Sequence, residues 1–297
     1  MKKIDWISWG IFFLLCCIWG SSFKLMKDST IGLSSDQIAS LRIFSAGLIF
    51  VPFGLIYFSK IPTNKVGLVI LSAAIGNLIP AYLFAEAMTK IDGSLGGILN
   101  SLTPICVIVI GILFFKITVQ IEKIIGVVIG FLGLLLLILL PIFTGEKNIQ
   151  FNNLGYSLLI ILATFLYGIN VNMVGKYFTE IHPIHLATVS LSFMTIPTGI
   201  ILWNQKFLQL DFSNPILQTS ISYTVFLGVF GSAIATALFY MLVKRASIIF
   251  ASLVTYGIPF VALFLGFLDG EKITILKLSC LGIILFGVYL ANKQGKK

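Results

Sequence analysis

The feature that most constrains this chain is its series of unbroken apolar runs, each about twenty residues long. A helix of that length spans the hydrocarbon core of a bilayer, which is roughly 30 Å thick. Backbone polar groups inside a bilayer must pair within the protein, so only helices or closed barrels can cross it. Barrel strands would give short segments of alternating hydrophobicity instead. The runs therefore predict an all-α integral membrane protein.

Charged residues are scarce along the chain. They make up 10% of the 297 residues, whereas 58% are hydrophobic. A soluble domain carries about a quarter charged residues, so this composition requires lipid as the solvent. The formal charge of +9 comes from lysines in short loops, and no basic run interleaved with aromatics indicates nucleic-acid binding. The predicted surroundings are a lipid bilayer, with no nucleic-acid partner.

Breaks that carry charge, proline or glycine divide the chain into ten predicted membrane-spanning helices. The first five cover residues 6–26, 36–58, 66–89, 94–115 and 121–143, and the second five cover residues 154–174, 184–203, 220–243, 248–268 and 273–292. With both termini inside, inner segments hold twelve Lys or Arg residues and outer segments hold seven. Because cytoplasmic loops are enriched in these residues, the split favours cytoplasmic N- and C-termini.

The two halves of the chain resemble each other when the first is shifted by 155 positions. The matched positions include Gly76 with Gly231, Phe84 with Phe239, Pro104 with Pro259 and, at a different offset, Trp19-Gly20 with Tyr167-Gly168. We therefore predict a first five-helix repeat over residues 1–145 and a second over residues 146–297. Because five is odd, the second repeat would be inverted in the membrane. Inverted repeats recur in secondary transporters, which bind substrate between the halves near the midplane and expose it alternately to each side.

Short motifs follow one another in order along both halves. They are residues 18–23, residues 41–44, residues 85–87 with the small residues that follow, Pro104, Pro259, residues 268–271 and residues 282–287. Together with the ten spans and the repeat, this series resembles the EamA-like branch of the drug/metabolite transporter superfamily over nearly the whole chain. The resemblance implies two inverted five-helix repeats, transport of small metabolites without ATP, and a bacterial inner membrane. One departure is Lys116, which stands where the family often has Glu, as Glu271 does in the second half.

Polar and aromatic residues at mid-depth are the candidates for a substrate cavity. They are Trp19, Asn77, Tyr82, Asn100, Thr103, Tyr167, Asn170, Tyr240, Thr255 and Tyr256. Pro104 and Pro259 are expected to break their helices and to free backbone carbonyls about one turn earlier, which would add polar groups to a cavity. For any single residue, an interhelical hydrogen bond or simple packing is the competing interpretation. As a set, they favour a polar and aromatic cavity.

Two charged residues lie inside predicted spans. Arg42 lies about two turns into the second span, and Glu86 lies near the outer end of the third, at a depth that would let them pair. Charges inside a membrane are costly and mark functional sites by default, so an outer gate or a proton-coupling site is one interpretation. The other is an interfacial ion pair that reaches water and only locks the helices together.

The remaining motifs narrow the class of protein. No phosphate-binding loop is present, so ATP hydrolysis is not expected. No cofactor or metal site is predicted, because His182 and His185 have no further ligands nearby. Two histidines and few intramembrane acids argue against an enzyme. The leading hypothesis is a secondary transporter that exports small organic metabolites, with amino acids or related compounds as first candidates. A channel and a non-transporting scaffold are the alternatives, and a homo-oligomer is left open.

Glycine pairs spaced four residues apart occur in two predicted helices, as Gly93 with Gly97 and as Gly126 with Gly130. Such pairs let two helices approach closely. We expect them to serve packing inside the protein rather than a dimer interface.

Overall fold

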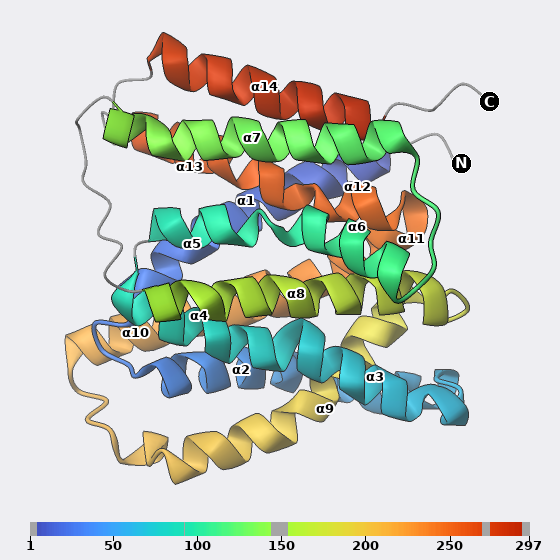
Figure 1. The fold of residues 1–297 in the computed structure, drawn as a ribbon. Helices are drawn as coiled ribbons and strands as arrows, with labels where there is room; N and C mark the ends of the chain where they lie inside the picture. The colour runs from blue at the N-terminus through green and yellow to red at the C-terminus, as the bar shows by residue number, and fades with distance from the viewer. Residues whose placement is uncertain (1–4, 92, 144–153, 269–273, 293–297) are drawn as a thin grey trace.

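The computed structural model describes residues 5–91, 93–143, 154–268 and 274–292, and the regular structure in these ranges is helical (Figure 1). The helices of the first half are α1 (Trp6–Ser29), α2 (Ser35–Tyr57), α3 (Val66–Ala73), α4 (Ile79–Lys90), α5 (Gly93–Asn100), α6 (Thr103–Leu113) and α7 (Ile121–Phe143). Those of the second half are α8 (Leu154–Tyr177), α9 (Pro183–Asn204), α10 (Pro215–Phe226), α11 (Ala235–Arg245), α12 (Ile248–Ser252), α13 (Val254–Leu268) and α14 (Ile275–Asn292). Short 3-10 turns lie at Phe58–Lys60, Thr63–Lys65 and Phe207–Gln209.

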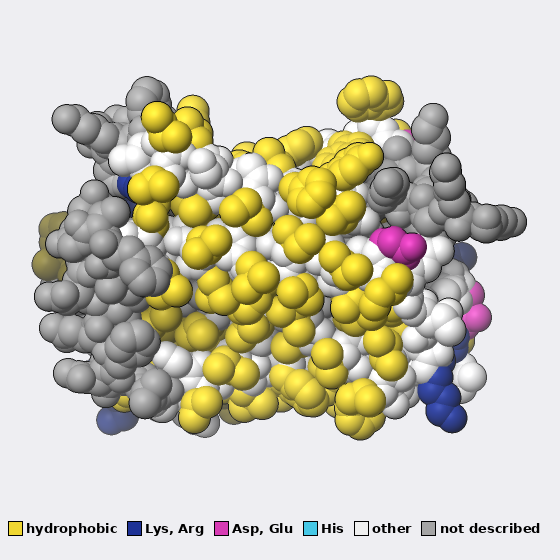
Figure 2. Space-filling model, turned by 45° about the horizontal axis from the view of Figure 1, so that its top comes forward, with side chains coloured by type: hydrophobic (Ala, Val, Ile, Leu, Met, Phe, Trp, Pro, Cys, Tyr) yellow, Lys and Arg dark blue, Asp and Glu magenta, His cyan; other side chains and the backbone are white. Residues whose placement is uncertain are grey.

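Six helical stretches are long and apolar enough to cross a membrane. They are Trp6–Ser29, Ser35–Lys60, Thr63–Lys90, Gly155–Tyr177, Pro183–Asn204 and Pro215–Arg245, and shorter apolar segments cover Thr103–Leu113, Ile248–Val261 and Ile275–Ala291. Apolar side chains dominate the face shown in Figure 2, and the charged side chains there gather towards the two ends of the bundle. The prediction of an all-α membrane protein with many spans is therefore confirmed.

Polar residues define where the first helices begin. Asp5 caps α1, because its carboxylate accepts hydrogen bonds from the hydroxyl of Ser8 at 2.6 Å and the backbone N–H of Ser8 at 2.9 Å. Those bonds, with a smaller effect of Arg245, lower the pKa of Asp5 to about 2. Ser34 and Gln37 form a capping box at the start of α2. Since Asp5 also pairs with Arg245, the start of α1 lies beside the end of α11.

Two of the long stretches contain a π-helical segment at matched positions. The segment η3 (Ala74–Leu78) joins α3 to α4, and the segment η5 (Leu227–Ile234) joins α10 to α11. A shift of 155 positions places residues 74–78 inside η5. A π-segment inserts an extra residue into the helical turn and is frequent at functional sites. The third and eighth predicted spans are thus continuous helices with a bulge in the middle.

The fourth and ninth predicted spans are each split in two. α5 ends at Asn100 and α6 begins at Thr103, whereas α12 and α13 are separated by Leu253 alone. Pro104 lies in the first turn of α6, where its missing N–H removes no helical hydrogen bond. Pro259 lies inside α13, and the helix continues past it. A helix end at Pro259 was therefore the wrong expectation, because the interruption comes earlier, at Leu253.

Close packing at glycines joins the halves along two helix pairs. α7 runs along α14, and a Cβ added at Gly126 or Gly130 would overlap atoms of α14 or the ring of Tyr256 (Figure 1). α2 runs along α9, where a Cβ at Gly47 would overlap Thr195. Gly126 and Gly130 therefore serve internal packing, as expected. A Cβ at Gly97 would meet no atom of the described residues within 4 Å, so no close packing of this kind is seen there.

The central helices contact one another across the halves in matched pairs. α1 contacts α13 as α6 contacts α8, and α1 contacts α11 as α4 contacts α8. In each of these pairs the two halves exchange roles. This arrangement surrounds the middle of the molecule with segments from both halves.

Candidate functional site

A cavity of about 110 Å³ lies among these central helices. Its lining comes from α1, α2, η3, α4, α5 and α6 of the first half and from α8, η5, α11, α12 and α13 of the second. Eight of the ten residues proposed from the sequence line it, namely Trp19, Asn77, Asn100, Thr103, Tyr167, Asn170, Tyr240 and Thr255. Phe23, Phe84 and Phe239 add aromatic walls. The cavity is therefore both polar and aromatic.

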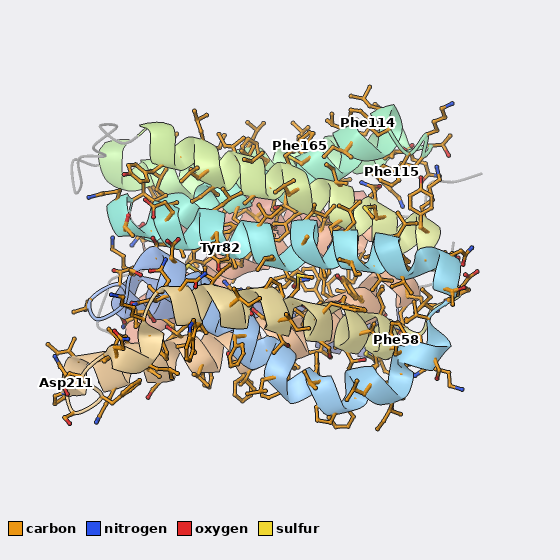
Figure 3. All side chains as sticks on the ribbon, turned by 90° about the horizontal axis from the view of Figure 1, so that it is seen from below. Phe58, Tyr82, Phe114, Phe115, Phe165 and Asp211 are labelled. Atoms are coloured by element: carbon orange, nitrogen blue, oxygen red, sulfur yellow. The ribbon has the colours of Figure 1, made fainter. Side chains whose placement is uncertain are left out.

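Two of the proposed residues lie outside this cavity. The hydroxyl of Tyr82 lies 2.5 Å from that of Ser40, at the contact between α4 and α2. Figure 3 shows Tyr82 within the helix bundle, away from the end that Asp211 marks. Tyr256 is fully buried and donates a hydrogen bond of 2.8 Å to the carbonyl of Val127 on α7. For both tyrosines the interhelical hydrogen bond is the better interpretation.

The expected pairing of Arg42 with Glu86 is absent from the structure. The carboxylate of Glu86 accepts a hydrogen bond of 2.5 Å from the hydroxyl of Ser35 and does not line the cavity. Arg42 lines the cavity instead, and its Nε donates a hydrogen bond of 2.8 Å to the hydroxyl of Ser232 in η5. Glu86 does face α2, but it bonds to the first residue of that helix, whereas Arg42, about two turns further on, turns toward η5. Depth along the chain cannot reveal this difference in direction.

Hydrogen bonds fix the polar side chains on one side of the cavity. Asn170 accepts a bond of 2.5 Å from Ser72 and lies 3.5 Å from the hydroxyl of Tyr240. Thr236 donates a bond of 2.9 Å to the Oδ1 of Asn77. The Nδ2 of Asn77 is buried and meets no hydrogen-bond partner among the described residues. This amide is a donor that a bound molecule could satisfy.

Interrupted helices also present backbone carbonyls near the cavity. The indole N–H of Trp19 donates a bond of 3.1 Å to the carbonyl of Gly231, within η5. The carbonyl of Asn100, which Pro104 cannot satisfy because it has no N–H, accepts a bond of 2.6 Å from the hydroxyl of Thr103. Both contacts link a helix irregularity to a side chain of the lining.

The sequence analysis missed four small hydroxyl residues of the lining. They are Ser22, Ser232, Thr236 and Ser252. The repeat could have identified Ser232, because a shift of 155 positions places the predicted cavity residue Asn77 on it. Trp19 and Tyr167 define the other offset, which places Ser22 on Asn170. The repeat, applied residue by residue, would therefore have found two of the four.

A second cavity of about 480 Å³ lies near the end of α11, where Lys244 borders it. It is lined by residues that follow α6, by the last turn of α8 and by the start of α12. Tyr240 lines this cavity and the central one alike. Its side chain therefore stands between the two spaces.

Together, these features define a membrane protein of many helical spans with a polar and aromatic cavity between its two halves. The sequence model of the EamA-like transporter family matches residues 7–139 and again residues 154–293. The chain therefore belongs to the EamA-like transporter family.

Relatives that match nearly the whole of this chain support this assignment. The chain is 23% identical to an uncharacterized transporter of Archaeoglobus fulgidus, covering 99% of this chain and 100% of the relative. It is also 23% identical to the uncharacterized inner membrane transporter YedA of Escherichia coli, covering 95% and 90%. A WAT1-related chloroplastic protein of Arabidopsis thaliana is 24% identical, covering 96% and 69%. A crystal structure of a protein 14% identical in sequence superposes with a TM-score of 0.70 over 96% of both chains and supports the fold.

Proposed function

We propose that this protein is a secondary transporter that carries a small organic metabolite across the membrane by alternating access. In this proposal ten spans form two inverted repeats, residues 1–145 and 146–297, and the central cavity binds the substrate. The membrane is a bacterial inner membrane with both termini in the cytoplasm, as the lysine distribution favours. Export is the proposed direction.

The observation that carries the proposal is a cavity lined by matched residues of both halves. Asn100 and Thr255 are repeat equivalents, and both line it. The two separate matches to the family support the duplication, as do the two π-segments. A site at the contact of two inverted halves can be exposed to either side when one half rocks against the other.

Tyr240 offers a route from this site to one side of the membrane. The cavity near Lys244 lies at the end of the bundle where Asp5 pairs with Arg245, and so on the side of the N-terminus. Tyr240 separates this cavity from the central one. We propose that movement of Tyr240 joins the two spaces when the transporter opens to the cytoplasm.

The test is counterflow in vesicles that contain the purified protein. Vesicles preloaded with one unlabelled compound from a panel of amino acids, carboxylates and other small metabolites are diluted into the same labelled compound. Saturable, transient accumulation of label is expected for a carrier and is not expected for a channel. Repeating the assay with an imposed pH gradient measures proton coupling.

The alternative functions predict different results. A channel would pass ions without saturable counterflow, and the scattered polar groups of the lining give it no continuous polar path. A scaffold would move nothing, although it would elute from gel filtration as a folded protein. The absence of counterflow for every compound, from protein shown to be folded, would refute the transporter.

A further inference from the structure

The central cavity contains a positive charge without a negative counterpart. Arg42 is the only charged side chain among the described residues that line it. Among the described residues, its guanidinium has no carboxylate within 4.0 Å. A cation inside a membrane protein is costly unless an anion or water compensates it. The free protein leaves this compensation to whatever fills the cavity.

The position of the guanidinium is fixed on one side only. Its Nε donates to Ser232, and no hydrogen bond of the two terminal nitrogens occurs within the described part of the chain. Neither terminal nitrogen is fully enclosed by protein atoms. Because Arg42 lines the cavity, both nitrogens are open to it. Arginine binds a carboxylate through two parallel hydrogen bonds, and the bond to Ser232 leaves the terminal nitrogens available for this contact.

We propose that the cavity binds its substrate as an organic anion, with a carboxylate on the terminal nitrogens of Arg42 and an uncharged apolar remainder against the aromatic walls. This inference rests on the proposed transport function and specifies the class of substrate. The walls suited to the apolar remainder are those of Phe84 and Phe239.

The same lining disfavours a zwitterionic amino acid. The described lining contains no acidic side chain to pair with an ammonium group. The three amide oxygens of the lining each already accept one hydrogen bond. The donors are Thr236 to Asn77, Ser72 to Asn170 and, at 3.5 Å, Thr103 to Asn100. The buried Nδ2 of Asn77, by contrast, is a further donor with no acceptor in the described part of the chain. A site with surplus donors and surplus positive charge suits a carboxylate whose remainder is neutral.

The experiment compares compounds that share one skeleton and differ in charge. Two series are used, namely 4-methylpentanoate with leucine and 4-methylpentanamide, and 3-phenylpropanoate with phenylalanine and 3-phenylpropanamide. Binding to the purified protein in detergent is measured by calorimetry. We expect a carboxylate to bind at least about tenfold more tightly than its amide, since a hydrogen bond to a charged group contributes about 1.5–3 kcal/mol. The zwitterion is expected to bind more weakly than the simple carboxylate.

Variants identify the residue responsible. Arg42→Gln is expected to remove the preference for carboxylate over amide, and Arg42→Lys to retain only part of it, because lysine lacks the planar fork. Arg245→Gln is the matched control, since the only other arginine of the chain lies at the end of the bundle and pairs with Asp5. If Arg42→Gln does not fold, Arg42→Lys and the wild-type comparison still decide the question.

The outcomes separate this inference from the transport function. Equal binding of carboxylate and amide, no binding of either carboxylate, or a preference that survives in Arg42→Gln would overturn the anion site. Counterflow of neutral or zwitterionic compounds would then leave the transporter intact. Carboxylate binding that depends on Arg42, without counterflow of that compound, would support the anion site and refute transport of it.

Discussion

The two halves of the protein line the central cavity largely with matched positions, and Arg42 and Tyr240 are among the lining residues that have no counterpart there. The matched pairs are Gly76 with Gly231, Asn77 with Ser232, Ala81 with Thr236, Phe84 with Phe239, and Asn100 with Thr255. Arg42 comes from α2, whereas no described residue of α9 lines the cavity. Tyr240 falls on Ala85 when the halves are aligned, and Ala85 does not line the cavity.

This comparison separates two tasks within one site. Matched positions suit a substrate that must be held equally well whichever half of the bundle has moved, as alternating access requires. Unmatched positions give the site a direction and a charge. In the proposal, Arg42 selects the substrate and Tyr240 closes one of the two exits.

Among matched positions, the paired glycines Gly76 and Gly231 are expected to differ most in how substitution by alanine affects stability and transport. A Cβ at Gly76 would overlap the side chain of Asn170, which Ser72 holds in place, whereas a Cβ at Gly231 would lie 3.3 Å from the hydroxyl of Ser22. Gly76→Ala is expected to cost about 1–3 kcal/mol of stability and to abolish counterflow. Gly231→Ala is expected to lower the melting temperature less and to keep transport.

Thermal unfolding in detergent, measured alongside counterflow, checks this pair. Equal melting temperatures for the two variants would show that the packing at Gly76 relaxes freely. The tight contact would then have no functional meaning.

The second prediction concerns Tyr240, which has no aromatic counterpart in the first half. Tyr240→Ala is expected to leave the two cavities joined, because the side chain between them is removed. Vesicles loaded with labelled substrate should then leak it without exchange. Tyr240→Phe is the control, since it keeps the ring and should remain tight. If vesicles that contain folded Tyr240→Ala retain the labelled substrate, Tyr240 is not the barrier between the two cavities.

Asn100 and Thr255 test the symmetry at a smaller scale. Asn100 ends α5 and Thr255 lies in the first turn of α13, so each adjoins a helix interruption, and both are buried beside the cavity. Asn100→Ala and Thr255→Ala are each expected to weaken binding by a few-fold, as for one neutral hydrogen bond of about 1 kcal/mol. Calorimetry with the same compound should give similar losses. A loss confined to one variant would show that the substrate contacts one half only.

The sequence predicted the membrane fold well, because a bilayer leaves a long apolar run little choice but a helix. It also placed most of the polar part of the lining, since polar residues at mid-depth are rare enough to be informative. The sequence did not predict the direction in which each side chain points around its helix axis. Adjacent residues point about 100° apart, so Tyr256 packs against α7 although Thr255 faces the cavity.

Small hydroxyl residues escaped the sequence analysis for a different reason. Serine in a membrane helix commonly bonds to the carbonyl one turn before it, as Ser22 does to Ile18 at 2.6 Å. Such a residue gives no sign of facing a cavity. Lys116, which stands where the family often has Glu, adopts a left-handed backbone conformation in the turn after α6. Its counterpart Glu271 lies outside the described residues.

The smallest effect is expected at Glu86, which a shift of 155 positions places on Met241. Glu86 was a candidate for proton coupling, but its carboxylate is held by Ser35 and lies away from the cavity. Glu86→Gln can keep that hydrogen bond, because the amide oxygen also accepts from a hydroxyl. We therefore expect counterflow and its dependence on pH to match those of the wild type. A flattened pH profile in Glu86→Gln would instead establish Glu86 as the proton site, and coupling would then lie in the one half that carries this acid.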